Sequence, residues 1–387
     1  MGFLDKLLKK KKSKKKAAPA CLPAVPAGRQ AGTAGGQGEP QHVSDAVLKI
    51  KEIVSVTSES VKVVFDVPEE LQLDYTFLPG QYVNVIVPID GKDEHRSYSI
   101  CSAVREPLAI GVKKVEKGVV STYFNEDAKA GDDVSVSFPL GGFTLSSVEG
   151  KYVAIAAGSG ITPVLSIAKF IEKSEKGHLN LFYGNSTEGS IMFNDDLKDI
   201  SKEALTMTHS LSKEEKEGYN AGRLNEENLT AFIKKDLGLL KAEGFYICGP
   251  EDMIIGAQNV LQKFGVAEDK IHYELFTTPT KMESNTKENM PEFDGVSKVT
   301  VILDEEEETF DLNASGDTIL GEAESHGIDA PYSCRGAICC TCKAKVLKGT
   351  AVMDKNFTLT DSEIDEGYVL TCQAHPNTEE VTISYDE

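Results

Sequence analysis

Half of the eight cysteines in this 387-residue chain lie close together, in the stretch "SCRGAICCTCKAKV". Cys334, Cys339 and Cys342 have the spacing C-x4-C-x2-C, and Cys372 follows after 29 intervening residues. Thiolates are strong ligands for soft metal ions and for iron–sulfur clusters. The spacing therefore predicts that these four side chains are metal ligands of one centre.

The same spacing is typical of plant-type ferredoxins, in which four thiolates hold a [2Fe–2S] cluster. A loop without regular structure can wrap three thiolates around one side, and the short path through Arg335, Gly336 and Ala337 brings backbone N–H groups near the sulfides. A zinc site is one alternative, although zinc usually takes two close cysteine pairs and only one occurs here. A reactive thiol cluster is another. Cys340 lies between ligand positions, and we expect it to point away as a packing residue.

A cluster of this type accepts single electrons at a low potential, about −400 mV, so it needs a donor. One candidate region is "GSGITP", directly after the apolar run "YVAIAA". Its glycines, Gly158 and Gly160, would let the backbone approach a ligand. Thr162 then Pro163 predict the N-cap and first residue of a helix whose N-terminus would face a pyrophosphate. Such a turn can equally be only a tight corner.

Another apolar run ends in "ICGP", which contains Cys248, Gly249 and Pro250. The carboxyl ends of parallel strands lie along one edge of a sheet, where open α/β sheets bind their ligands. We therefore expect these residues to reach the same crevice as the glycine turn.

Two motifs lie earlier in the chain. In "RSYS", Arg96 could clamp a phosphate, Tyr98 could stack on a flat heterocycle, and Ser99 could bond a ring nitrogen. The alternative is an ordinary strand with a surface ion pair and a half-buried ring. The stretch "GVVST" would open a helix and supply a second phosphate cradle, formed by Gly118, Val119, Val120 and Ser121.

The elements that must position these residues fall into distinct regions. Short runs of period-two alternation predict an antiparallel barrel or sandwich first, and strand–helix alternation then predicts a parallel sheet. A polar stretch separates off a last unit. The predicted divisions are a basic amphipathic tail (1–16), a flexible linker (17–42), the barrel (43–147), the parallel-sheet unit (148–278), a second linker (279–294) and the cysteine-bearing unit (295–387).

The charge distribution is uneven. The chain carries −20 overall, but the first 16 residues hold eight lysines against Asp5, which leaves −27 for the rest. Apolar Phe3, Leu4, Leu7 and Leu8 share a helical face, so this tail could be a peripheral anchor for an anionic membrane surface or merely a solvated basic segment. Scattered cysteines outside the cluster motif favour the cytoplasm over a secreted disulfide framework. We expect a cytoplasmic protein, with contact to the inner face of the membrane as an option.

Taken in order, these motifs resemble the ferredoxin–NADP reductase superfamily with a C-terminal ferredoxin domain, over about residues 43–387. The resemblance implies an antiparallel flavin-binding barrel, a parallel-sheet nucleotide-binding domain and a C-terminal β-grasp domain. Within the superfamily, "AVMDKNFTLTDSEIDEGYVLTCQAHP" most resembles reductase subunits of phenylacetyl-CoA epoxidases. A membrane-associated reductase for a fatty-acid desaturase or other hydroxylase is an alternative. A non-catalytic redox-sensing or electron-carrier module is another.

The resemblance also implies roles for single residues. FAD would lie on the barrel, with FMN as an alternative, and Arg96 and Ser121 would hold its pyrophosphate. Tyr98 would stack on the isoalloxazine and Ser99 would lie near its N5. Cys248 would border the path of the hydride.

The stretch "HYELF" contains Glu274 and Phe276, similar to the family's acid and aromatic beside the flavin. Phe276 could equally be a core residue at a strand end. The implied catalytic residues are Ser99, Cys248 and Glu274.

The nicotinamide coenzyme is suggested by "SLSKEEKEGY", which resembles the segment that recognises a 2′-phosphate. Ser212 matches, but Lys213 replaces an arginine and keeps the charge without the bidentate fork. We expect NADPH in preference to NADH, although Lys213 could be only a solvated loop charge.

The last unit suggests the kind of partner. Residues 295–387 hold 19 Asp and Glu against 6 Lys and Arg. Much of this charge could serve solubility alone. Like-signed charge can also steer an oppositely charged partner in short-lived encounters. We expect an oxygenase or other electron-acceptor protein to dock here, and no nucleic-acid partner.

Overall fold

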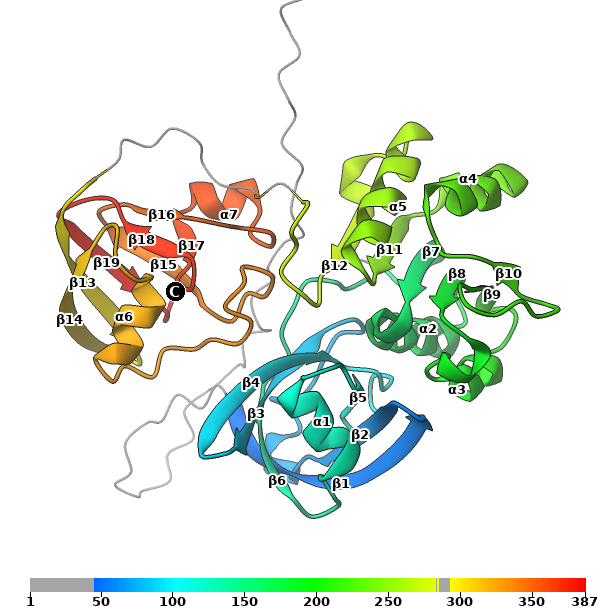
Figure 1. Cartoon of the computed structure of the whole chain (residues 1–387), viewed down its shortest axis with the longest axis horizontal. Coiled ribbons are helices and arrows are strands. Elements are labelled where there is room, and N and C mark those ends of the chain that lie inside the picture. The colour runs from blue at the N-terminus through cyan, green and yellow to red at the C-terminus, as the bar shows by residue number, and fades with distance from the viewer. Residues whose placement is uncertain (1–44, 146, 283, 285–292) are drawn as a thin grey trace, which may run out of the picture.

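The computed structural model describes residues 45–145, 147–282, 284 and 293–387. The predicted basic tail and the first linker lie outside the described residues. Figure 1 shows three units, coloured blue to cyan, green, and yellow to red along the chain. Within the described ranges, no helix is long and apolar enough to cross a membrane.

The first unit is an antiparallel barrel, as predicted. Its sheet has the order β4-β3-β6-β1-β2-β5. A bridge between Ile100 and Ile110 joins the end of β4 to β5 and so brings the two edge strands together. Inward-facing apolar side chains such as Val63, Val85 and Ile110 are fully buried, which explains the alternating pattern of the sequence. The elements are β1 (Asp45–Thr57), β2 (Ser60–Asp66), β3 (Tyr82–Ile89), β4 (Lys92–Ser99), β5 (Ala109–Lys113), α1 (Val119–Glu126) and β6 (Asp133–Ser137).

The second unit is a parallel sheet flanked by helices. Its order is β10-β9-β8-β7-β11-β12, so successive strands extend first to one side of β7 and then to the other. This reversal creates a switch point between β7 and β11, where open α/β sheets bind ligands. The elements are β7 (Gly150–Ala157), α2 (Ile161–Ser174), β8 (Gly177–Asn185), α3 (Asn194–Asp199), β9 (Leu205–Leu211), β10 (Asn220–Ala221), α4 (Glu226–Lys235), β11 (Gly244–Cys248), α5 (Glu251–Lys263) and β12 (Ile271–Glu274).

The third unit is built on a mixed sheet of order β14-β13-β19-β15-β17, in which β13 and β19 pair in parallel and the other neighbours are antiparallel. The segment 326–342, between α6 and β15, is called the cluster loop below because it carries three of the four candidate ligands. The elements are β13 (Val296–Leu303), β14 (Glu306–Asn313), α6 (Ile319–Ser325), β15 (Lys343–Lys348), β16 (Ala351–Met353), α7 (Asp361–Asp365), β17 (Tyr368–Leu370), β18 (Ala374–Pro376) and β19 (Glu380–Ser384).

Short 3-10 turns complete the described secondary structure: η1 (Glu69–Leu71), η2 (Gly158–Gly160), η3 (Glu188–Ser190), η4 (Leu237–Lys241) and η5 (Glu268–Lys270).

The three units share packing surfaces. Buried Ala337 and Phe357 of the third unit belong to the same apolar core as Tyr273 and Leu275 at the end of the parallel sheet. The chain that leaves this sheet is also anchored, because the Glu251 carboxylate accepts backbone N–H bonds from residues 280–282. The first residues of the predicted second linker are therefore fixed against α5.

Candidate functional site

The glycine turn lies at the switch point of the parallel sheet. Gly158 has a left-handed φ of 53°, a conformation that favours glycine. A Cβ on Gly160 would lie 2.1 Å from the Cys248 carbonyl oxygen. Only glycine therefore allows the turn after β7 to approach the end of β11.

The helix after this turn begins earlier than expected. Gly158–Gly160 form η2, which continues directly into α2 at Ile161 with Gly160 at the N-cap. The prediction that Thr162 caps the helix is wrong, because its buried hydroxyl donates to the Ser159 carbonyl oxygen at 2.9 Å. Pro163 lies in the first helical turn, where its missing N–H is tolerated.

A cavity of about 550 Å³ lies between β4, the segment after β12 and the cluster loop. It brings together residues that are far apart in the sequence. The expected site residues that line it are Arg96, Ser99, Glu274, Phe276, Cys334 and Cys339. The cavity thus has residues expected beside the flavin on one side and two candidate cluster ligands on the other.

Ser99 and Glu274 form a polar pair in the wall of this cavity. The Ser99 hydroxyl donates to Glu274 Oε2 at 3.3 Å. Burial raises the pKa of Glu274 to about 8, although the bond from Ser99 acts in the opposite direction. Its carboxyl group is therefore mostly neutral at pH 7. Phe276 is 41% exposed and lines the cavity, so it is not the core residue that one alternative suggested.

Arg96 and Tyr98 occupy different surroundings. The Arg96 guanidinium pairs with Glu94 at 3.1 Å and donates to the His95 carbonyl oxygen at 2.8 Å, while remaining about half exposed. The Tyr98 ring packs edge-on against Phe124 with 6.0 Å between centroids, and burial raises its pKa. Arg96 reaches the cavity, whereas Tyr98 does not line it.

The segment 118–121 starts α1, as the sequence predicted. Gly118 is the N-cap, Val119 is exposed and Val120 is buried in the barrel core. The Ser121 hydroxyl donates to the Gly118 carbonyl oxygen at 3.0 Å and accepts the Val115 N–H at 3.3 Å. Ser121 therefore stabilises the turn into the helix, and this segment lies outside the lining of the cavity.

The remaining nucleotide-site candidates lie along the carboxyl edge of the parallel sheet. Ser212 and Lys213 follow β9 and are tied to the end of β8 by backbone bonds of 3.0 and 2.9 Å to Asn185 and Ser186. Pro250 is the N-cap of α5, and Gly249 precedes it.

The Cys248 side chain is completely buried, and burial raises its pKa well above the usual value. Cys248 is therefore a neutral thiol, placed opposite Glu274 in the register of β11 and β12.

The four candidate ligands approach one another in two pairs. The Cys334 and Cys339 sulfurs are 3.1 Å apart, and the neighbouring Cys372 thiol and burial raise the pKa of Cys342 well above its usual value. The bond from Cys339, together with loop N–H groups such as that of Gly336 at 3.3 Å, lowers the pKa of Cys334 below its usual value. Two thiol pairs, with N–H groups directed at sulfur, match the donor set of a two-iron cluster.

The cluster loop has an unusual backbone. Arg335 and Ala337 have left-handed φ values of 48° and 60°, which non-glycine residues rarely adopt. Between them, a Cβ on Gly336 would lie 1.8 Å from the Thr278 hydroxyl oxygen. Gly336 therefore lets the loop approach the chain that leaves the parallel sheet.

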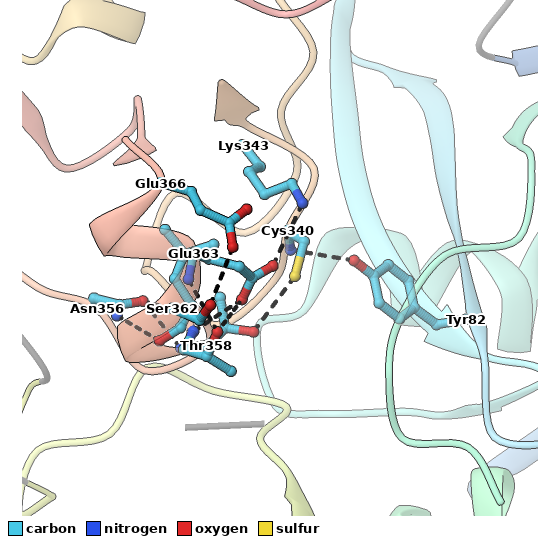
Figure 2. Close-up of polar contacts among 10 residues, drawn as sticks. Tyr82, Cys340, Lys343, Asn356, Thr358, Ser362, Glu363 and Glu366 are labelled. Carbon is cyan, nitrogen blue, oxygen red and sulfur yellow. Dashed lines mark hydrogen bonds and ion pairs between the residues drawn. The ribbon is translucent and has the colours of Figure 1, made fainter. Parts of the chain in front are cut away.

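Sequence reasoning missed residues of the barrel that contact this loop. Figure 2 shows the Tyr82 hydroxyl facing Cys340, whose backbone N–H it accepts at 3.3 Å. The Cys340 sulfur lies on the other side, 3.5 Å from the Thr358 hydroxyl. No local signal could identify Tyr82, because "QYVNVIVPI" is an ordinary alternating strand and its contact spans 258 residues.

Three family models match the chain. They are an oxidoreductase FAD-binding domain at residues 47–145, an oxidoreductase NAD-binding domain at 154–259 and a 2Fe-2S iron–sulfur cluster binding domain at 301–377. The chain is also 36% identical over 349 residues to a subunit of the 1,2-phenylacetyl-CoA epoxidase of Escherichia coli, with 88% of this chain and 97% of the relative covered. The chain belongs to the ferredoxin–NADP reductase-like family with a C-terminal [2Fe–2S] domain. The predicted fold class and enzyme class are thereby confirmed, as are FAD, a [2Fe–2S] cluster and a nicotinamide coenzyme.

Other relatives share this arrangement. The ferredoxin reductase component of a 3-ketosteroid-9-alpha-monooxygenase from Mycolicibacterium smegmatis is 31% identical, with 88% of this chain and 97% of the relative covered. The structure of phthalate dioxygenase reductase has a TM-score of 0.55 at 20% identity, and the match covers 90% of this chain and all of that one. The reductase is therefore an oxygenase component that transfers electrons from NAD(P)H through FAD and a [2Fe–2S] cluster.

Proposed function

We propose that this reductase takes electrons from NADPH and delivers them to an oxygenase of the phenylacetyl-CoA epoxidase type. The observation that carries the electron route is the cavity shared by Ser99, Glu274 and the cluster ligands Cys334 and Cys339. The relative at 36% identity supports the type of partner.

The residues of the site would make different contacts with FAD. When bound, FAD would supply the chemistry of accepting a hydride and of releasing single electrons to the cluster. Ser99 and the neutral Glu274 carboxyl would offer the flavin ring polar contacts without adding a charge, and Phe276, which also lines the cavity, would offer it an apolar contact. Arg96 and the N-terminus of α1, at 118–121, hold the pyrophosphate. The Arg96–Glu94 pair must open or shift for this contact.

The nicotinamide nucleotide binds along the carboxyl edge of the parallel sheet. Gly158, Gly160, Thr162 and Pro163 form the corner at its pyrophosphate, and 248–250 form the opposite wall. Gly160 packs closely against the Cys248 carbonyl and Cys248 pairs with Glu274 in the sheet, which supports a position for the nicotinamide near Glu274. The adenosine end then extends over β8 towards Ser212 and Lys213.

The preference between NADPH and NADH depends on the charges after β8 and β9. Lys213 is exposed there. Lys216, by contrast, is ion-paired with Glu188, and the Glu188 carboxylate also accepts a hydrogen bond from the Tyr219 hydroxyl at 2.9 Å. The Lys216 bond lowers the pKa of Glu188, so this carboxylate is ionised at neutral pH. We propose that Lys213 pairs with the 2′-phosphate and that Glu188 limits the affinity of the reductase for NADPH.

Lys213→Ala should raise the KM for NADPH about tenfold and leave the KM for NADH nearly unchanged, because only NADPH presents a phosphate to the lysine. Glu188→Gln should lower the KM for NADPH relative to NADH, since it releases Lys216. Steady-state reduction of ferricyanide with each coenzyme measures both effects. If Lys213→Ala changed the KM for NADPH and the KM for NADH equally, Lys213 would not be part of the 2′-phosphate site.

The partner is proposed to present a basic patch to the third unit. The acidic hairpin strand β14 lies at the edge of this unit away from the parallel-sheet unit (Figure 1), and Glu306, Glu307 and Glu308 on it are exposed. The formal charge of residues 295–387 is −13, from 19 acidic and 6 basic residues. Such a surface steers an oppositely charged protein without requiring high affinity.

Turnover with the epoxidase oxygenase component should therefore slow severalfold as salt rises from about 50 to about 500 mM, where the Debye length falls about threefold. Reduction of a small neutral dye, which needs no protein docking, should change much less in the same buffers. If both rates fall together, salt acts on coenzyme binding, and the proposal that the partner docks at this acidic surface is wrong. If the oxygenase receives no electrons at any salt concentration, the proposed partner is wrong.

A further inference from the structure

An aromatic and cationic stack joins the barrel to the cluster loop beside the cavity. The rings of His95 on β4 and Tyr332 on the cluster loop are stacked, with 4.3 Å between centroids and 21° between planes. The Arg335 guanidinium lies 4.0 Å from the centroid of the same tyrosine ring. These three residues are called the docking stack below, and all of them line the cavity.

The docking stack is fixed on its ferredoxin side. Arg335 forms an ion pair with Glu324 of α6, and its backbone carbonyl oxygen accepts a bond from Gln373 at 3.1 Å. Arg335 also immediately follows the ligand Cys334 and has a left-handed φ. A movement of the stack would therefore move the part of the loop that holds a cluster ligand.

Polar contacts surround the docking stack and continue the same interface. The hydroxyl oxygens of Ser97 and Ser333 are 2.9 Å apart, and Asn84 Nδ2 donates to Thr341 Oγ1 at 2.9 Å. With the bond between Tyr82 and Cys340, these contacts connect β3 and β4 to the cluster loop on both sides of Cys339.

The stack has the chemistry of an orienting contact. Neutral hydroxyl pairs at an interface contribute little net free energy, because water can replace each partner. Stacked rings and a cation over a ring add attraction that depends on their mutual geometry. Burial lowers the pKa of His95, which favours the neutral ring beside cationic Arg335 and so avoids repulsion across the tyrosine.

We propose that Tyr332, held between His95 and Arg335, is a positioning residue that sets the rate of electron transfer from the flavin to the cluster. It docks the cluster loop against the flavin cavity. In the step concerned, one electron leaves the reduced flavin and enters the oxidised cluster, and no covalent bond forms or breaks. The proposal rests on the electron route described under the proposed function.

The test uses the full-length reductase with both cofactors, mixed anaerobically with NADPH in a stopped-flow instrument. Loss of flavin absorbance reports hydride transfer, and bleaching of the cluster bands reports the following electron transfer. Tyr332→Ala should slow cluster bleaching about tenfold or more, since a small misplacement of reacting groups can cost this much. Hydride transfer, FAD content, iron content and the cluster midpoint potential should stay unchanged.

Two further variants separate positioning from damage to the cluster loop. Tyr332→Phe keeps the ring and should restore nearly the wild-type rate. His95→Ala removes the barrel side of the stack without substituting any residue of the cluster loop, and it should also slow bleaching. His326→Ala is the matched control, because His326 stacks on Phe310 within the third unit and not on the barrel.

A wild-type bleaching rate in His95→Ala would overturn the proposal, even if Tyr332→Ala proved unstable. A shifted midpoint potential in Tyr332→Ala with no slowing in His95→Ala would also overturn it, since the tyrosine would then tune the cluster. Failure of the electron route itself would look different, because the wild-type cluster would then not be reduced by NADPH at all.

Discussion

Cys339→Ser should abolish the visible absorption of the [2Fe–2S] cluster, whereas Cys340→Ser should leave it in place. Only Cys339 completes the C-x4-C-x2-C spacing, and its sulfur lies 3.1 Å from that of Cys334. The Cys340 sulfur lies instead beside the Thr358 hydroxyl, and its backbone N–H contacts Tyr82 (Figure 2). Loss of one thiolate from a four-thiolate set removes half of the protein ligands of one iron.

The measurement is the absorption spectrum and iron content of the two purified variants, normalised to FAD. Cys340→Ser should keep about two irons per chain, as the cluster type requires. Cys339→Ser should keep its FAD and still reduce ferricyanide with NADPH, because that reaction needs only the flavin. A cluster retained in Cys339→Ser, or lost in Cys340→Ser, would contradict the ligand assignment.

Gly160→Ala should lower kcat/KM for NADPH about 100-fold or more, the scale expected when reacting groups are displaced by about 1 Å. The added Cβ would lie 2.1 Å from the Cys248 carbonyl oxygen and 2.9 Å from the Gly249 nitrogen. Both are backbone atoms, so no side-chain rotation can relieve the clash. The turn after β7 must therefore move away from the end of β11, and the two walls of the nucleotide site separate.

Gly189→Ala is the matched control, because Gly189 is exposed and a Cβ there would meet no atom within 4 Å. Stopped-flow reduction of the flavin by NADPH compares the two variants. Reduction of the cluster by dithionite should be normal in both variants. Their flavin absorbance should show that the barrel still holds FAD, and thermal unfolding should show that the fold is intact. Hydride transfer at the wild-type rate in Gly160→Ala would mean that the nucleotide does not bind at this corner.

Local sequence signals were reliable where the chemistry itself is local. The spacing of three cysteines within nine residues depends on how one loop can wrap a cluster, and the alternation of "VKVVFD" depends on which face of a strand is buried. Even there, the beginning of α2 was misplaced. A Thr-Pro pair is typical of a helix start. The preceding glycines form a 3-10 turn, however, and α2 follows it directly and already begins at Ile161.

By itself, the sequence determined the ligand spacing, the glycine corner, and the order of a barrel, a parallel sheet and a cysteine-bearing unit. Only the tertiary structure decided that the cluster loop lies against β3 and β4, next to the pair formed by Ser99 and Glu274. The contacts that fix this arrangement, such as Tyr82 with Cys340 and Gly336 with Thr278, join segments that are distant in the chain. Such contacts depend on how separately folded surfaces meet, and no residue pattern within either segment encodes its partner.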